Sequence, residues 1–181
     1  RQARKNGEAA STPPLYTTID TMDCIAKFGR AASYGQAIDV CPGVRATFYN
    51  AGHILGSSSI LVTGTENGAA RSVLFSGDIG SAGHHFLQPQ QTPPYADTVV
   101  METTYGDRLH RSFDNSREEF YKAVNSALSR RGNVVIPTFA LERAQELLFI
   151  IRQGVDQNKL PPAVKVFLDS PMAISATQIF E

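Results

Sequence analysis

The pattern of hydrophobic and polar residues divides the chain into a strand-rich first part and a second part in which helices and strands alternate. In the first part, short apolar runs bounded by turn residues predict strands at 37–40, 44–49, 59–63 and 71–76. The Asn67-Gly68 dipeptide is typical of a tight hairpin between the last two. A further apolar run ends at Val100, and a short helix over 17–28, with Thr18 as its cap, precedes the first strand.

Beyond Gly106 the apolar spacing becomes that of helices separated by short strands. Three helices are predicted. The first begins with a capping-box pattern at 115–118, the second spans 141–153, and the third begins at Ser170-Pro171. In the second helix the residues expected to be buried are Leu147, Leu148 and Ile151. Apolar runs at 133–137 and 164–168 predict the strands between the helices. Such alternation is typical of a parallel sheet covered by helices, within an α/β fold.

Three polar residues stand at the ends of predicted strands of the first part: His53, Asp78 and Glu102. Glycines flank the first two, so these side chains are expected to be presented to solvent rather than packed. Because neighbouring strands bring their ends together, we expect one shared site. Neutral imidazole and carboxylate are ligands that zinc accepts when no thiolate is offered, and a carboxylate can bridge two ions.

The segments that carry these residues resemble the β-CASP branch of the metallo-β-lactamase fold. They are Ala-Gly-His-Ile-Leu-Gly-Ser at 51–57, Ser-Gly-Asp-Ile-Gly at 76–80 and Glu-Thr-Thr-Tyr-Gly-Asp-Arg at 102–108, with further similarity at 136–147 and 167–173. The resemblance runs from about Leu15 to the last residue. It implies part of a metallo-β-lactamase αββα sandwich over 15–105, followed by the start of a β-CASP lobe over 106–181. Residues 1–14 are expected to form a flexible arm or a severed loop.

Members of this family are zinc-dependent nucleases acting on RNA, and the resemblance implies roles for individual residues. His53 matches a motif that binds one zinc, and Asp78 matches a motif whose carboxylate bridges two zinc ions. Glu102 matches an acidic residue that is not a primary ligand but hydrogen-bonds a histidine thought to protonate the leaving group. Asp78 and Glu102 are therefore the predicted catalytic residues, and RNA the predicted substrate. Arg108 and His110 either contact substrate phosphates or form ordinary solvated surface.

The chain also departs from the family pattern. A His-x-His-x-Asp-His cluster is expected upstream of His53, yet residues 1–52 contain no histidine, and two later histidines are expected beyond Glu181. We therefore interpret the chain as an internal segment of a longer protein and predict that the segment alone is inactive. Two alternatives stay open: a noncatalytic RNA-processing scaffold on the same fold, or a hydrolase of small esters. The second does not need the helical part after Gly106.

Composition is that of a globular enzyme segment rather than a nucleic-acid coat. The hydrophobic content of 42% over 181 residues supports a real core, and the formal net charge of zero provides no basic field. No apolar run approaches the length that spans a membrane. Cys24 and Cys41 fit no metal spacing and are too few for a disulfide framework, so we expect buried or idle thiols in the cytoplasm. No membrane partner is expected, and a homodimer stays open.

Several other polar residues are expected to have structural rather than chemical roles. Because adjacent side chains generally point in different directions, the pair His84-His85 is not expected to bind a metal ion. Ser57 and Ser58 are expected to hydrogen-bond the backbone near His53, because no histidine base accompanies them. Glu142 stands where many family members have glycine, which we interpret as variation on a helix surface.

Overall fold

The computed structural model describes residues 14–81 and 87–180, and the chain divides into two compact units, one ending at Ser33 and the other beginning at Tyr34. The first unit contains α1 (Thr18–Ala26), in which no residue is buried. Its N-cap is Thr17, one residue before the predicted cap, because the Thr17 side chain and the Asp20 carboxylate form a reciprocal capping box. The described residues contain no helix long and apolar enough to cross a membrane.

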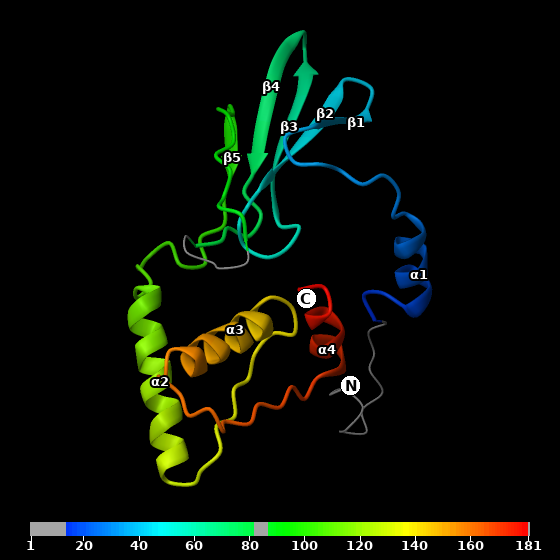
Figure 1. Ribbon diagram of the computed structural model, residues 1–181. Helices are drawn as coiled ribbons and strands as arrows, with labels where there is room; N and C mark the ends of the chain where they lie inside the picture. Colours follow the sequence, from blue (N-terminus) through cyan, green and yellow to red (C-terminus); the bar gives the residue numbers. More distant parts are fainter. Residues whose placement is uncertain (1–13, 82–86, 181) are drawn as a thin grey trace. The chain divides into compact units, whose positions relative to one another are not determined.

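The second unit begins with a five-stranded sheet whose order follows the sequence (Figure 1). Its strands are β1 (Ala37–Cys41), β2 (Val44–Asn50), β3 (Ser58–Glu66), β4 (Ala69–Phe75) and β5 (Thr98–Val100). The first three pairings are antiparallel and β4 pairs with β5 in parallel. The predicted strands of this part are therefore confirmed, and β2, β4 and β5 run in the same direction.

Turn residues and one carboxylate set the pairing of β4. Asn67 and Gly68, with φ angles of 52° and 80°, form the predicted tight turn between β3 and β4. On the other side of β4, the Asp97 carboxylate accepts hydrogen bonds from the amide and hydroxyl of Ser72, at 2.7 and 2.8 Å. The Ser72 hydroxyl in turn accepts from the Asp97 amide at 3.0 Å. These contacts hold the start of β5 against β4.

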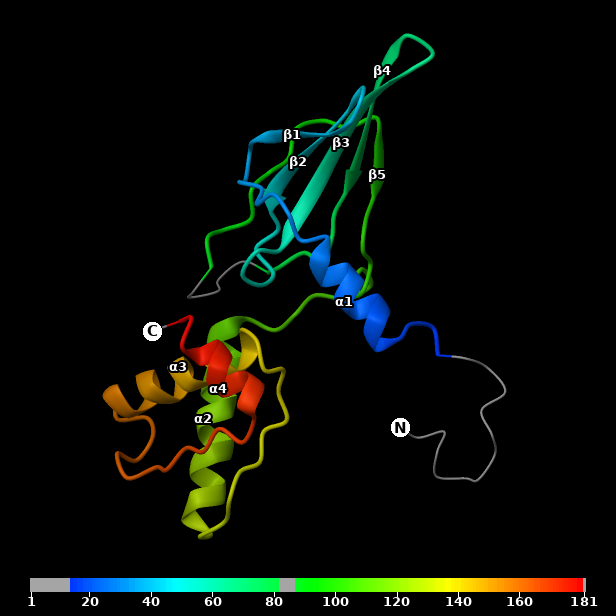
Figure 2. The ribbon, with the colours of Figure 1, turned by 90° about the vertical axis from the view of Figure 1, so that its right-hand side faces the viewer.

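Three helices follow in chain order: α2 (Phe113–Ser129), α3 (Arg143–Asp156) and α4 (Pro171–Thr177). The three helices lie beside one another (Figure 2). Tyr121 and Val124 of α2 form a buried cluster with Ile150 and Leu160. The Tyr121 hydroxyl donates to the carbonyl of Ile150 at 2.9 Å, so the buried phenol is satisfied. A Cβ at Gly154 would lie 2.6 Å from the Tyr121 ring, so the close approach of α2 and α3 depends on this glycine.

The helices match the predicted elements, but two details differ. The cap of α2 is Ser112, whose hydroxyl accepts from the Asn115 amide at 3.3 Å, so the pattern at 115–118 lies inside the helix. The helix begins early because Phe113 packs against the buried cluster.

The residues of α3 predicted to be buried, Leu147, Leu148 and Ile151, are only half-buried. Ile150 takes the buried position, because α2 covers a neighbouring face of α3. The start of α4 is as predicted, with Ser170 as cap and Pro171 in the first turn.

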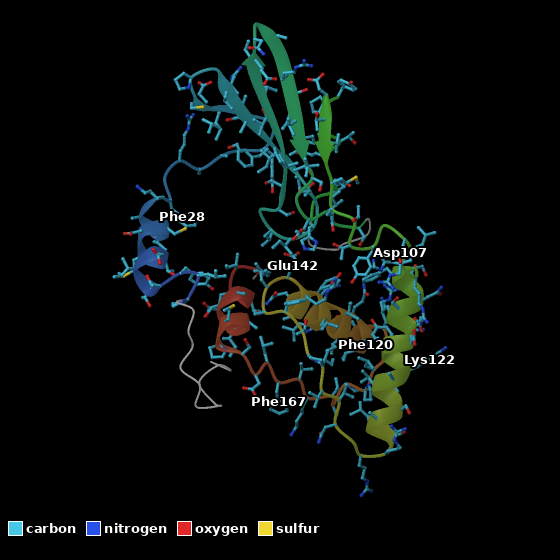
Figure 3. All side chains as sticks on the ribbon, turned by 180° about the vertical axis from the view of Figure 1, so that it is seen from behind. Phe28, Asp107, Phe120, Lys122, Glu142 and Phe167 are labelled. Carbon is cyan, nitrogen blue, oxygen red and sulfur yellow. The ribbon has the colours of Figure 1, made fainter. Side chains whose placement is uncertain are left out.

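The strands predicted at 133–137 and 164–168 are not formed, and within 14–81 and 87–180 the five strands above make up the sheet. Both segments instead line a hollow of about 460 Å³ beside α2. Val135 and Phe167 are 89% and 83% exposed, and Figure 3 labels Phe167 on its segment. An apolar run becomes a strand only where a second strand supplies ladder hydrogen bonds, and these two segments do not pair. The predicted parallel sheet is therefore absent from the described residues.

Candidate functional site

The three residues singled out in the sequence lie at one edge of the sheet. His53 follows the end of β2, Asp78 follows β4 and Glu102 follows β5. Because these three strands run in the same direction, the loops after them lie at the same end of the sheet (Figure 1). His53 and Asp78 are exposed, and Glu102 is half-buried. The tertiary structure thus places at one end of the sheet three loops whose polar residues the sequence spaces by 25 and 24 positions.

The loop that carries His53 is held by hydrogen bonds of its own backbone and of two serine hydroxyls. The Ala51 amide donates to the Ser57 carbonyl at 3.1 Å and closes the loop. The Ser57 hydroxyl oxygen accepts from the amides of His53 and Ile54, at 3.0 and 3.2 Å. Ser58 donates to the Gly56 carbonyl at 3.2 Å. The expectation that Ser57 and Ser58 hydrogen-bond the local backbone is therefore confirmed.

Glycines allow the Asp78 loop to pack directly on the His53 loop. The Gly80 amide donates to the Ala51 carbonyl at 3.0 Å, and a Cβ at Gly80 would overlap the carbonyl oxygen of Gly52. Gly77 has a φ of 57°, and a Cβ there would lie 2.5 Å from the Ser58 carbonyl oxygen. Backbone therefore meets backbone where the two loops touch, which sets the distance between their polar side chains.

Glu102 braces the Asp78 loop from the side of β5. Its carboxylate accepts from the Ile79 amide and from the Thr104 hydroxyl, both at 2.7 Å. Its own amide donates to the Ser76 hydroxyl at 2.9 Å. The Thr104 hydroxyl and, next, the Ile79 amide lower the pKa of the Glu102 carboxyl, with a smaller attraction from His53. Glu102 is therefore held by hydrogen bonds that favour its carboxylate form.

In their donor types, His53 and Asp78 suit zinc, which accepts imidazole nitrogen and carboxylate oxygen. Over the parts of the chain that the structure describes, no three side chains of the His, Cys, Asp and Glu types gather to hold a metal ion. Zinc binding by His53 and Asp78 therefore stays a prediction, which requires further ligands beside these two. His84 and His85 lie within 82–86, outside the described residues. Cys24 and Cys41 are free and exposed, so of the two alternatives expected, buried or idle thiols, burial is excluded.

Arg108 and His110 meet at an aromatic ring that sequence reasoning did not single out. The rings of Tyr105 and His110 pack edge to face with centroids 4.5 Å apart, and the Arg108 guanidinium lies 5.3 Å from the Tyr105 centroid. Arg108 also pairs with Asp107 at 3.7 Å. The residues are exposed and follow Glu102 directly. In the sequence, a tyrosine placed between the acidic Glu102 and the pair Arg108 and His110 is the signal that could have indicated this contact.

Glu142 does not lie on a helix surface, as the sequence interpretation had it. The residue is 5% exposed, has a φ of 68° and accepts a hydrogen bond from the Leu55 amide at 3.2 Å. The family resemblance, in which this position is often glycine, was the signal for a positive φ here, because glycine adopts positive φ without strain.

Known proteins similar to this chain include three from different domains of life, although no family model matches it. Ribonuclease TTHA0252 of Thermus thermophilus is 38% identical over 160 residues, which are 88% of this chain and 35% of that protein. Transcription termination factor FttA of Methanococcus maripaludis is 32% identical over 145 residues, 78% of this chain and 22% of that protein. Endoribonuclease ysh1 of Schizosaccharomyces pombe is 31% identical over 165 residues, 90% of this chain and 21% of that protein. The chain thus spans between about a fifth and about a third of these relatives.

Proposed function

Because the chain belongs to the β-CASP family of metallo-β-lactamase-fold RNA-processing nucleases, we propose that its protein is a zinc-dependent ribonuclease that hydrolyses RNA phosphodiester bonds. The observation that carries this proposal is the placement of His53, Asp78 and Glu102 on three loops at one edge of the sheet. Relatives whose names describe ribonuclease and endoribonuclease activity support RNA as the substrate.

The proposal also assigns the elements to lobes. Residues 15–105, which contain the five-stranded sheet, would belong to a metallo-β-lactamase αββα lobe. Residues 106–181, which contain α2, α3 and α4, would belong to a β-CASP lobe. The change from strands to helices near Gly106 supports this division.

The chain's own residues would have distinct tasks. His53 and Asp78 would hold two zinc ions together with ligands from elsewhere in the protein, Asp78 by bridging them. When bound, zinc supplies a cation that makes water nucleophilic near neutral pH and stabilises negative charge on phosphate. Glu102 would keep the Asp78 loop in place through Ile79 and orient the imidazole of a general acid. Arg108 and His110 would contact RNA phosphates from beside Tyr105.

The proposal is tested by removing the two predicted ligands in the full-length protein. Asp78→Ala should abolish cleavage of a labelled single-stranded RNA and deplete bound zinc, because two cations lose their shared anion. His53→Ala should remove metal from one site. The matched control is Asp39→Ala, which removes an exposed carboxylate from β1 of the same sheet.

Two results would overturn the assignment. Near-normal cleavage with full zinc in Asp78→Ala would remove Asp78 from the site, and retention of both zinc ions in His53→Ala would remove His53. A wild-type protein that binds RNA but holds no zinc and cleaves nothing would instead indicate the noncatalytic RNA-processing scaffold.

A further inference from the structure

Glu142 occupies a backbone conformation that a residue with a side chain seldom adopts. Its φ and ψ are 68° and −59°, and the Arg143 amide donates to the Leu141 carbonyl at 2.8 Å. This hydrogen bond closes a three-residue γ-turn with Glu142 at its centre, in the rare and strained form with positive φ. Such strain persists only where the surroundings hold the residue in place, and it gathers at functional sites.

The Glu142 side chain is buried and bonded to a distant part of the chain. Glu142 is the N-cap of α3, yet its side chain makes no capping hydrogen bond to that helix. Its carboxylate accepts from the Leu55 amide instead, across 87 positions of sequence. Figure 3 labels Glu142 at the start of α3. Glu142 as a whole residue is 5% exposed, so burial removes hydration from its side chain, and the hydrogen bond to Leu55 replaces part of it.

The turn of α3 that follows Glu142 is a firm anchor for this contact. Gln145 is buried, and its amide nitrogen donates to the carbonyls of Ala140 and Ala173 at 3.1 and 3.4 Å. The same nitrogen donates to the Thr177 hydroxyl at 3.0 Å. The start of α3 is thereby tied to the segment before it and to α4. Glu142 therefore joins the loop at the sheet edge to a well-held part of the helical region.

The Leu55 contact completes the support of the His53 loop. Three consecutive amides, those of His53, Ile54 and Leu55, donate to side-chain oxygens. Ser57 takes the first two from within the loop, and Glu142 takes the third from outside it. His53 is exposed, and the backbone that these hydrogen bonds hold sets the position and direction of its Cα–Cβ bond.

We propose that Glu142 is a positioning residue, whose carboxylate orients His53 by holding the Leu55 amide. The proposal rests on the proposed function, in which His53 is a zinc ligand. It also assigns a task to α3 in that function: the helical region sets the geometry of a ligand loop in the sheet region. A glycine at this position would relieve the strain but lose the acceptor.

Three substitutions in the full-length protein separate the acceptor from the backbone strain. Glu142→Gln keeps an acceptor oxygen, Glu142→Ala removes it and keeps the strain, and Glu142→Gly removes both. The measurements are hydrogen exchange of a peptide covering 51–57, the imidazole NMR signals of His53, and zinc affinity. Glu119→Ala, which removes an exposed acid from α2, is the control.

In Glu142→Ala and Glu142→Gly we expect amide exchange over 51–57 to rise about tenfold and the His53 signals to shift or broaden. Zinc affinity should fall roughly 10- to 100-fold, the loss typical when the support of a ligand is removed. Glu142→Gln should stay near wild type in all three measurements. Glu142→Gly should melt at a higher temperature than Glu142→Ala, although both lose the loop contact.

Unchanged exchange over 51–57 and unchanged His53 signals in both Glu142→Ala and Glu142→Gly would overturn the proposal. Equal losses in Glu142→Gln and Glu142→Ala would also overturn it, because the acceptor oxygen would then not be the cause. If the wild-type protein bound no zinc, the proposed function would fail, while exchange and the His53 signals would still decide whether Glu142 positions the loop.

Discussion

The Glu102 carboxylate accepts a hydrogen bond of 2.7 Å from the backbone amide of Ile79, the residue that follows Asp78. Glu102 comes from the loop after β5 and Ile79 from the loop after β4, so the contact joins two parallel strands just beyond their paired ends. The Glu102 carboxylate therefore bonds to the loop of a predicted metal ligand. That Glu102 is not a primary ligand stays a prediction.

Glu102→Gln should keep most of the bound zinc while slowing RNA cleavage in the full-length protein. The amide oxygen of glutamine still accepts from Ile79, but the negative charge that would orient a general acid is lost. Residues that support a ligand typically contribute on the order of 10- to 100-fold to activity. Zinc content and single-turnover cleavage, compared with Glu119→Gln on α2, provide the measurement. Zinc loss as complete as in Asp78→Ala would make Glu102 a ligand.

Gly80→Ala should destabilise the protein and loosen the candidate site. The added Cβ would overlap the Gly52 carbonyl oxygen, a backbone atom that cannot move without displacing the His53 loop. Overpacking typically costs about 1–3 kcal/mol in free energy of unfolding. Gly106→Ala is the matched control, since its nearest neighbours lie at 3.4 Å. Urea denaturation measures the difference, and equal stabilities of the two variants would contradict the predicted loop packing.

Asp97 should make the stability of the sheet depend on pH in the acid range. The Ser72 hydroxyl and then the Ser72 amide lower the pKa of Asp97 in the folded state. A carboxyl whose pKa is lower in the folded state stabilises the fold at pH values above its pKa in the unfolded state, about 3.9. This stabilisation is lost as the pH falls through the pKa of the folded state. Asp97→Asn should therefore flatten the acid side of the stability profile. Denaturation midpoints from pH 5 downward test this against Asp39→Asn, and an unchanged acid slope would contradict it.

The 181-residue chain alone should neither cleave RNA nor hold two zinc ions. If His53 and Asp78 are zinc ligands, as the proposed function has it, they supply only part of a ligand set, and each tetrahedral ion would be left mostly to water. Elemental analysis after dialysis, followed by a cleavage assay with added zinc, checks this outcome. Stoichiometric zinc with specific cleavage would show that other histidines, such as His84, His85 or His110, complete a site of another kind.

The sequence by itself determined the helices, the strands of the first part and the polar residues at their ends. Turn residues such as Asn67-Gly68 and the cap at Ser170 mark where elements change, because backbone preference there is a property of a few adjacent residues. The glycines beside His53 and Asp78 indicated presented side chains for the same reason, and both are exposed. The resemblance to a family came from three such short segments.

Tertiary structure alone decided which distant groups meet. The sequence could not show that Glu142 would be buried against Leu55, because that contact depends on how α3 lies against a loop 87 positions earlier. The predicted strands at 133–137 and 164–168 failed for a related reason. An apolar run in the sequence predicts that a segment is buried, but a strand also needs a second strand to hydrogen-bond with. Pairing therefore depends on two segments and cannot be predicted from one.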